Sequence, residues 1–155
     1  MSDHKKNPPF SLHIPILFRH CDPAGYVFFP RFYEMFQDAC ELWMTEHLGI
    51  DLCEMIVQQK TGQPTAYLEC QFIQPCLLGE KLDIAVILDK FGTSSIEIRF
   101  IGTVAGEVRL RARSVQVVIS LKDGRPAPIK DAMRERMQTY MEQTEVPDNV
   151  YPQRR

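Results

Sequence analysis

The segment from residue 31 to about residue 48 is apolar around most of a helix, and this constrains the fold more than any other feature. Its apolar side chains recur at helical spacing, and further residues widen the stripe beyond one narrow face. A helix with so wide an apolar surface must be covered by other structure. Pro30 suits its first turn and Gly49 suits its end. The stripe consists of Phe32, Met35, Phe36, Ala39, Cys40, Trp43 and Met44, widened by Tyr33, Leu42 and Leu48.

The middle of the chain has the pattern of β-strands. Apolar and polar residues alternate strictly in several runs, and short turns at 91–93 and 104–106 indicate hairpin-like antiparallel connections. A capping-box-like pair, Asp51 and Glu54, predicts a short second helix that ends near Gly62. The expected strands are residues 11–18, 64–78, 81–90, 96–101 and 108–113, with a β-prone continuation over 115–121, and a last helix is expected over 129–143.

This order of elements predicts an α+β fold. A helix as apolar as residues 31–48 must bury itself against the antiparallel sheet, and a sheet that curves around the helix satisfies this most simply. Edge strands and leftover apolar faces favour pairing with a second copy of the chain. We expect a single domain over residues 11–145, a disordered lead-in at 1–10 and a loose tail at 146–155.

Composition excludes several classes of function. The net charge of −2 gives no general attraction to nucleic acid or to an anionic membrane. The arginines at 109, 111 and 113 are interpreted as a solvated strand face rather than a binding patch. Five cysteines without a C-x-x-C pair indicate a reducing compartment. No signal-peptide pattern and no apolar run of about 20 residues is present, so we expect a soluble cytoplasmic protein.

The stretch Asp22-Pro23-Ala24-Gly25 places one carboxylate in a tight turn just ahead of the apolar helix. A helix start offers unpaired backbone N–H groups, and a carboxylate beside such donors suits chemistry on a carbonyl. The competing interpretation is a simple turn in which the carboxylate accepts backbone N–H groups. Burial would raise the pKa of Asp22 and helix N–H groups would lower it, so the sequence leaves that balance open. The aromatic wall expected beside it consists of Phe28, Phe29, Phe32 and Tyr33.

Other candidates for chemistry are weaker. His20 and Cys21 invite a Cys–His hypothesis, but adjacent side chains generally point in different directions, so a structural or gating role for His20 is favoured. Glu69 could be a second acid or base, although an outward-facing strand residue is the better interpretation. The remaining histidines show no metal-ligand spacing, and no dinucleotide, Walker A or serine-hydrolase motif occurs. No metal site is therefore predicted.

The element order and the stretch from His20 to Tyr33 resemble the hot-dog thioesterases of the 4-hydroxybenzoyl-CoA thioesterase family. The similarity rests on Cys21 to Gly25, on Val27, and on the aromatic residues that flank Pro30. It extends over about residues 11–121. Weaker matches are the segment 62–64 and the turn at 92–95.

The resemblance implies roles for individual residues. Asp22 would be the catalytic carboxylate, either as a nucleophile on the thioester carbonyl or as the general base that activates water. The backbone N–H of Phe29 would polarise the thioester oxygen, and Gly25 would let the backbone approach the acyl group closely. Lys90 would be what remains of a basic cluster for the coenzyme A phosphates. The implied substrate-binding residues are Pro23, Ala24, Tyr26, Val27, Phe28, Tyr33 and Lys90.

Two departures from the family pattern bear on selectivity. Tyr26 stands where the family usually has Ile or Val, and Phe29 replaces the common Tyr, His or Trp. Only the backbone of Phe29 is needed for the oxyanion role, so catalysis would survive this change although acyl selectivity would not be assured. Family members assemble as dimers or tetramers with active sites between subunits. The resemblance implies no cofactor besides the coenzyme A that the substrate carries.

The resulting hypothesis is an acyl-CoA thioesterase that acts on a short-chain or aromatic, 4-hydroxybenzoyl-like acyl group. The alternative is a non-catalytic hot-dog module that binds acyl-CoA as a sensor or assembly partner. A hot-dog dehydratase is a third option, but it normally needs a histidine and a carboxylate acting together, and His20 sits in the wrong motif for this.

Overall fold

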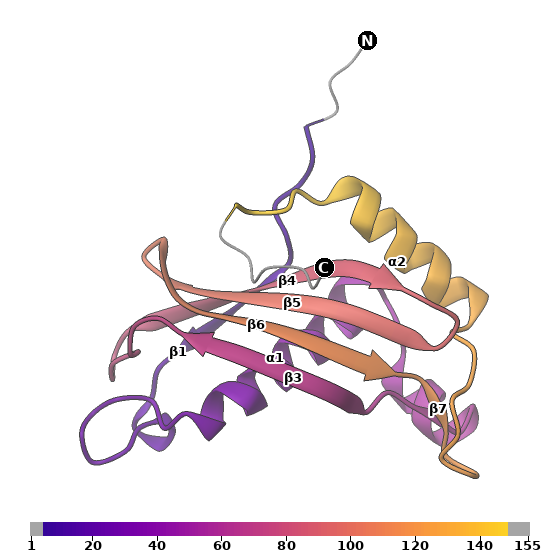
Figure 1. Ribbon diagram of the computed structural model, residues 1–155, viewed down its shortest axis with the longest axis horizontal. Helices are drawn as coiled ribbons and strands as arrows, with labels where there is room; N and C mark the ends of the chain where they lie inside the picture. Colours follow the sequence, from indigo (N-terminus) through magenta and orange to yellow (C-terminus); the bar gives the residue numbers. More distant parts are fainter. Residues whose placement is uncertain (1–4, 149–155) are drawn as a thin grey trace.

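The computed structural model describes residues 5–148 of the 155-residue chain (Figure 1). Two helices, several short helical turns and two antiparallel sheets make up the fold, so the predicted α+β class is confirmed. In chain order the elements are β1 (Ser11–Pro15), η1 (Phe18–His20), α1 (Pro30–Leu42), η2 (Trp43–His47), η3 (Glu54–Gln58), β2 (Thr61–Gly62), β3 (Thr65–Phe72), β4 (Lys81–Phe91), β5 (Ser95–Val104), β6 (Glu107–Val117), β7 (Ile119–Ser120) and α2 (Asp131–Gln143).

The main sheet has the strand order β1-β4-β5-β6-β3, and every neighbouring pair is antiparallel. β4, β5 and β6 follow one another through hairpins, as the turns in the sequence predicted. β3 lies at one edge, so one side of its backbone has no partner strand in this sheet. β2 and β7 form a separate two-stranded pair.

Three strand predictions differ from the structure at their ends. β1 stops at Pro15 and a short helical turn, η1, follows it. β3 stops at Phe72, because the N–H groups of Ile73 and Gln74 both turn to the carbonyl of Arg109. The β-prone runs 108–113 and 115–121 form one continuous strand, β6, followed by the short β7.

α1 continues without a break into η2, so the helical segment covers the predicted range. Gly49 ends it with a positive φ of 68°, as expected of a helix stop. The helix lies behind the sheet in Figure 1 and buries its wide apolar stripe. Phe36 stacks on Phe100 of β5 with ring centroids 4.8 Å apart, and Trp43 is fully buried.

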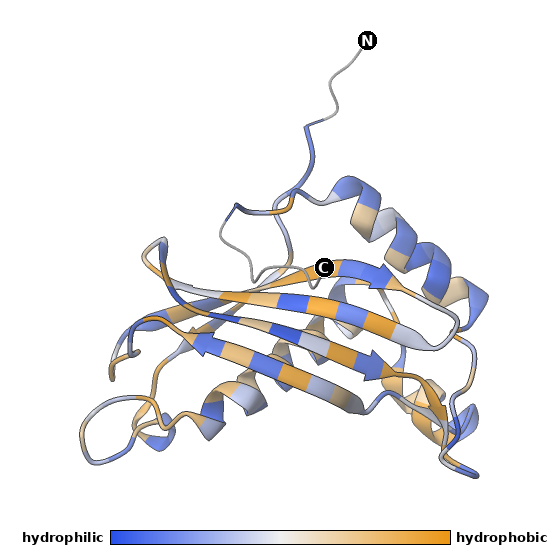
Figure 2. Cartoon of the chain, in the orientation of Figure 1, coloured by the Kyte–Doolittle hydropathy of each residue, from blue (hydrophilic) through white to orange (hydrophobic). Residues whose placement is uncertain are grey.

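Apolar and polar residues alternate between the two faces, as Figure 2 shows along β5 and β6. The face toward α1 carries the core residues, among them Leu82 and Ile98. The opposite face carries charged pairs, including Arg99 with Asp89, whose side chains are both buried. The difference in polarity between the two faces holds the register, because a shift by one residue would exchange the apolar and charged side chains.

α2 packs beside α1 on the same core and lies along the β4 side of the sheet (Figure 1). The Tyr140 hydroxyl donates to the carbonyl of Val86 at 2.5 Å and accepts from the N–H of Phe10 at 3.0 Å. Asn7 pairs with Thr144, and the Asn7 carbonyl accepts the N–H of Glu145. Residues 7–10 therefore join the packed structure. Residues 1–4 of the predicted lead-in and residues 149–155 of the predicted tail lie outside the described residues.

Candidate active site

Residues 20–29, here called the Asp22 loop, close on themselves between η1 and α1. The N–H of Phe28 donates to the His20 carbonyl at 2.9 Å, and the N–H of Asp22 donates to the Tyr26 carbonyl at 2.9 Å. The turn is completed by the Gly25 N–H, which donates to the Asp22 carbonyl at 3.0 Å. Gly25 has a φ of +81°, a conformation that strains any residue with a side chain. The turn predicted from the sequence is confirmed.

The Asp22 carboxylate is partly exposed and lies at the base of this turn. Its Oδ1 accepts the N–H of Ala24 at 2.9 Å. This contact is the turn-stabilising bond that the simpler interpretation predicted. The bond also fixes the carboxylate while leaving it accessible to a ligand, so the two interpretations are compatible.

Phe29 precedes the first residue of α1 and has helical backbone angles, with φ −54° and ψ −33°. Its carbonyl accepts the N–H of Phe32 at 3.1 Å. Within residues 5–148, the Phe29 N–H donates to no protein acceptor. Pro30 has no N–H at all, so this group is the free donor at the positive end of the helix. It can donate to an oxygen that becomes negatively charged during a reaction.

An exposed set of aromatic rings, here called the aromatic patch, lies beside the start of α1. The ring of Phe29 contacts Phe28, Tyr33 and Phe72, with centroids 5.7, 6.4 and 6.5 Å apart. Phe29 is 55% exposed and Phe72, on the edge strand β3, is 46% exposed. The patch consists of Phe28, Phe29, Tyr33 and Phe72.

The other predicted substrate-binding residues on the loop have different surroundings. Pro23 and Ala24 are exposed at its tip. Tyr26 is exposed and bridges Leu77. Val27 is buried and belongs to the core, so it supports the loop from beneath.

His20 and Cys21 do not form a dyad. The Nδ1 of His20 accepts the N–H of Leu17 at 2.9 Å, and the Cys21 thiol faces the carbonyl of the same residue at 3.6 Å. Burial lowers the pKa of His20, and the nearby Arg19 lowers it further. A neutral, buried imidazole that accepts a backbone bond is a structural group. This contact agrees with the structural role among those expected of His20.

Lys90 and Glu69 lie apart from the Asp22 loop. Lys90 is near the end of β4 and pairs loosely with Glu97, whereas the start of β4, at Lys81, lies beside β1 just before the loop. Ten residues of strand separate these ends by roughly 30 Å. Glu69 pairs with Arg113 on the sheet face away from the helices, as an outward-facing strand residue would.

The segment between β3 and β4, residues 73–80, packs against the Asp22 loop. The Val27 N–H donates to the Cys76 carbonyl at 2.9 Å, and the Leu78 N–H donates to the Gly25 carbonyl at 3.1 Å. Sequence reasoning missed this contact and the Arg109–Glu80 ion pair behind it. Arg109 was assigned to a solvated face, and Glu80 was given no role.

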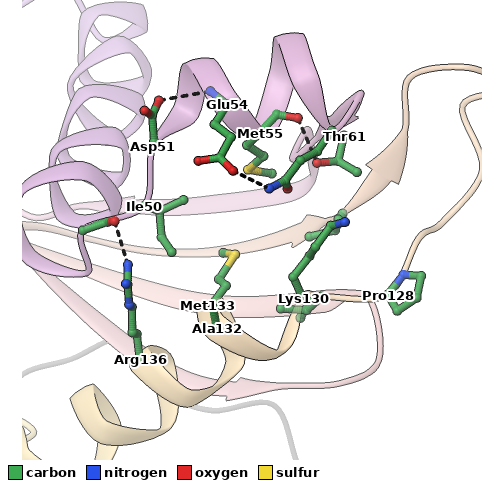
Figure 3. A pocket seen from close by; sticks show the side chains of 14 residues that line it. Ile50, Asp51, Glu54, Met55, Thr61, Pro128, Lys130, Ala132, Met133 and Arg136 are labelled. Carbon is green, nitrogen blue, oxygen red and sulfur yellow. Dashed lines mark hydrogen bonds between the residues drawn. The ribbon is translucent and has the colours of Figure 1, made fainter.

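A cavity of about 230 Å³ opens elsewhere, between η3 and α2 (Figure 3). Several of its polar groups already have protein partners. Asp51 accepts the Glu54 N–H, and Arg136 donates to the carbonyls of Leu48 and Gly49. None of the residues predicted for the site lines this cavity.

Two further findings concern metals and membranes. In the part of the chain that the structure describes, no three His, Cys, Asp or Glu side chains are grouped as a metal site would require. Among the same residues, no helix has the length and apolar character that crossing a bilayer requires.

Comparison with known proteins adds to this geometry. The sequence matches the thioesterase-like superfamily over residues 16–137. The 1,4-dihydroxy-2-naphthoyl-CoA hydrolase of Nostoc punctiforme is 25% identical over 130 residues, which cover 84% of this chain and 87% of that protein. A solved gentisyl-coenzyme A thioesterase is 26% identical with a TM-score of 0.74, covering 81% of this chain and 99% of that one. A 1,4-dihydroxy-2-naphthoyl-CoA thioesterase from Synechocystis shares the fold, with 21% identity, a TM-score of 0.75, and coverage of 92% and 98%.

Proposed function

Because this chain belongs to the thioesterase-like superfamily, whose members have the hot-dog fold, we propose that it hydrolyses the thioester of an acyl-coenzyme A with an aromatic acyl group. Water is added across the bond between the acyl carbon and sulfur, which releases the carboxylic acid and free coenzyme A. The observation that carries the proposal is the Asp22 loop, which presents a fixed carboxylate and the free Phe29 N–H on one closed turn. A 4-hydroxybenzoyl-like or a short-chain acyl group fits the same chemistry.

Asp22 and Phe29 have different roles in the reaction. The Asp22 carboxylate attacks the thioester carbonyl to form an anhydride and release coenzyme A, and water then cleaves the anhydride to free the acid and restore Asp22; alternatively, Asp22 takes a proton from the water that attacks the thioester. In either case the carbonyl oxygen gains negative charge, which the Phe29 N–H stabilises. Gly25 leaves room beside the backbone for the acyl group. The bond from the Ala24 N–H holds Asp22 in place for both routes.

The aromatic patch supports the choice of an aromatic acyl group. Rings favour offset or edge-to-face contacts with other rings, and Phe28, Phe29 and Tyr33 expose such surfaces beside the loop. Tyr26 adds a further exposed ring, while Pro23 and Ala24 border the entrance. The similar proteins support this choice as well, since their names carry the gentisyl and 1,4-dihydroxy-2-naphthoyl groups.

The exposed edge of β3 supports a homo-oligomer, either a dimer or a tetramer. An edge strand next to exposed apolar side chains invites pairing with a second chain, and Phe72 lies on that edge. Antiparallel pairing along β3 would bring the Lys90 end of one copy to the Asp22 end of the other. A phosphate of coenzyme A would then contact Lys90 of the second copy. In this proposal the main sheet wraps around one long central helix, made of α1 and its continuation η2.

The test is release of free coenzyme A thiol from a panel of acyl thioesters. The panel contains acetyl, hexanoyl, palmitoyl, benzoyl, 4-hydroxybenzoyl, 2,5-dihydroxybenzoyl, 1,4-dihydroxy-2-naphthoyl and phenylacetyl thioesters. Wild type and Asp22→Asn are compared, with Asp123→Asn as the matched control. Asp123 also uses its Oδ1 to accept the N–H two residues later, at 3.0 Å, but it lies in the turn after β7. Turnover that Asp22→Asn abolishes and Asp123→Asn retains supports the proposal.

The second candidate is an acyl-CoA-binding module without catalysis. The single contact between Asp22 and the Ala24 N–H would serve as well in a purely structural turn, which favours this candidate. Tight binding of an acyl-CoA from the panel, with no thiol release from any member, would favour it. Equal turnover by wild type and Asp22→Asn would instead show that the carboxylate has been assigned the wrong role.

A further inference from the structure

The position of the Asp22 loop depends on the neighbouring segment 73–80. Besides the bonds within its own turn, the loop is held by the Val27 N–H on the Cys76 carbonyl and by the Leu78 N–H on the Gly25 carbonyl. Tyr26 and Leu77 face each other between these bonds. A displacement of segment 73–80 would therefore displace Gly25 and the residues that lead to Phe29.

Segment 73–80 is in turn held at its end by Ile16, which exchanges backbone hydrogen bonds with Gly79 and Glu80, and along its length by one residue of β6. The carbonyl of Arg109 accepts the N–H groups of Ile73 and Gln74 at 2.9 and 3.1 Å. Its guanidinium donates to the Pro75 carbonyl at 2.7 Å and to both carboxylate oxygens of Glu80 at 3.0 and 2.8 Å. Arg109 thus contacts both ends of the segment.

Glu80 completes this arrangement from the far end of the segment. Its Oε1 accepts the Leu77 N–H at 2.6 Å while it also accepts from Arg109. The side chains of Arg109 and Glu80 are only 13% and 21% exposed. A bidentate, charge-assisted pair that is this well shielded is stronger and more directional than a surface ion pair. Hydrogen bonds from Arg109 lower the pKa of Glu80, so the carboxylate stays charged.

We propose that the Arg109–Glu80 pair is a positioning element for the reaction, which sets the Asp22 loop through segment 73–80. The inference rests on the proposed function for its catalytic consequence. The dependence of the Asp22 loop on the Arg109–Glu80 pair does not rest on the proposed function. Neither residue is proposed to touch the substrate. The pair determines the positions of Gly25 and the Phe29 N–H at the moment when the thioester oxygen becomes charged.

The pair is expected to affect kcat more than KM. An oxyanion donor contributes mainly in the transition state, so its misplacement lowers kcat and leaves ground-state binding largely intact. A displacement of about 1 Å can reduce the rate by about 10²-fold. Arg109→Lys keeps the charge but loses the two-pronged geometry, and we expect kcat to fall at least tenfold.

The control is Arg99→Lys. Arg99 also makes a buried pair with a carboxylate, Asp89, on the same sheet, but this pair contacts neither segment 73–80 nor the Asp22 loop. Both substitutions remove the guanidinium from a shielded ion pair and are expected to lower thermal stability. Only Arg109→Lys should lower kcat per folded molecule. Glu80→Gln keeps an oxygen for the Leu77 N–H and loses the charge, so it serves if Arg109→Lys does not fold.

Amide hydrogen exchange supplies a readout that does not depend on catalysis. In Arg109→Lys or Glu80→Gln the amides of Val27 and Leu78 should exchange at least tenfold faster than in wild type, and Arg99→Lys should leave them unchanged. If the wild type hydrolyses no thioester, the proposed function fails. Faster amide exchange in the variants would still support the dependence of the Asp22 loop on the Arg109–Glu80 pair. Unchanged exchange and unchanged kcat in a folded Arg109→Lys protein overturn the inference. An equal loss of kcat in Arg99→Lys overturns it too, because the effect would then be one of general stability.

Discussion

The Nδ1 of His20 accepts the backbone N–H of Leu17 at 2.9 Å, and the carbonyl of His20 accepts the N–H of Phe28. His20 thus links Leu17, which follows β1, to Phe28, which precedes α1, and it closes the Asp22 loop. An imidazole that accepts through Nδ1 must carry its proton on Nε2. A second proton would turn Nδ1 into a donor facing another donor.

This geometry predicts a pH-dependent stability. The pKa of His20 is lowered from 6.5 in the folded protein by burial, and the unfolded chain therefore takes up the proton first as the pH falls. The contribution of His20 is complete above the unfolded pKa and is lost as the pH falls through 6.5 toward the folded pKa. Urea unfolding at pH 5.5 and 7.5 should show the loss in wild type and a smaller one in His20→Asn, whose amide oxygen can accept the same N–H. Equal pH dependence of both proteins would contradict this role.

Gly25 and Gly106 form a matched pair for separating strain from catalysis. Both have positive φ, +81° and +79°, and an added Cβ would meet nothing within 4 Å at either position. Alanine at either site should therefore cost about 1 kcal/mol in the free energy of unfolding. Only Gly25→Ala should also lower kcat, because only Gly25 lies in the Asp22 loop. Chemical unfolding and thiol-release kinetics on both variants provide the check, and equal kcat values would remove Gly25 from the site.

The backbone and the ring of Phe29 can be tested separately. Phe29→Pro removes the N–H, and the observed φ of −54° already suits proline. We expect kcat to fall by about 10²–10³, the usual loss for one oxyanion donor. Phe29→Ala keeps the N–H and removes the ring, so it should keep most of kcat and change the preference among acyl groups. A Phe29→Pro enzyme with wild-type kcat would disprove the oxyanion assignment.

The edge strand β3 predicts how the assembly can be broken. Phe72→Glu places a charge on the exposed edge beside the aromatic patch and should shift the protein toward monomers in sedimentation experiments. Val57→Glu, on the exposed surface of η3, changes an exposed apolar residue in the same way and should leave the assembly unchanged. A wild-type monomer at micromolar concentration, or an unaffected Phe72→Glu oligomer, would exclude pairing through this edge.

The sequence predicted α1 and the central strands well because their apolar spacing reflects burial directly. The Asp22 turn was likewise predictable, since proline and glycine fix its local geometry. The Arg109–Glu80 pair was not predictable, because it joins residues 29 positions apart whose meeting depends on sheet register. The end of β3 at Phe72 was missed for the same reason: the carbonyl that draws Ile73 and Gln74 away belongs to β6. Lys90 corresponds in sequence position to the basic cluster of the family, but the antiparallel order places it at the opposite end of β4 from the Asp22 loop.

The contact between Phe10 and Tyr140 has a consequence for the order in which the chain assembles. These residues are 130 positions apart, so their hydrogen bond closes a loop that includes most of the protein. The entropic cost of such a closure is met only once the sheet between them has formed. We therefore expect the bonds of the Asp22 loop, which span fewer than ten residues, to form before the two ends of the domain meet. A fluorescent probe beside Tyr140 would then report the last step of folding, after the turn that carries Asp22 is already in place.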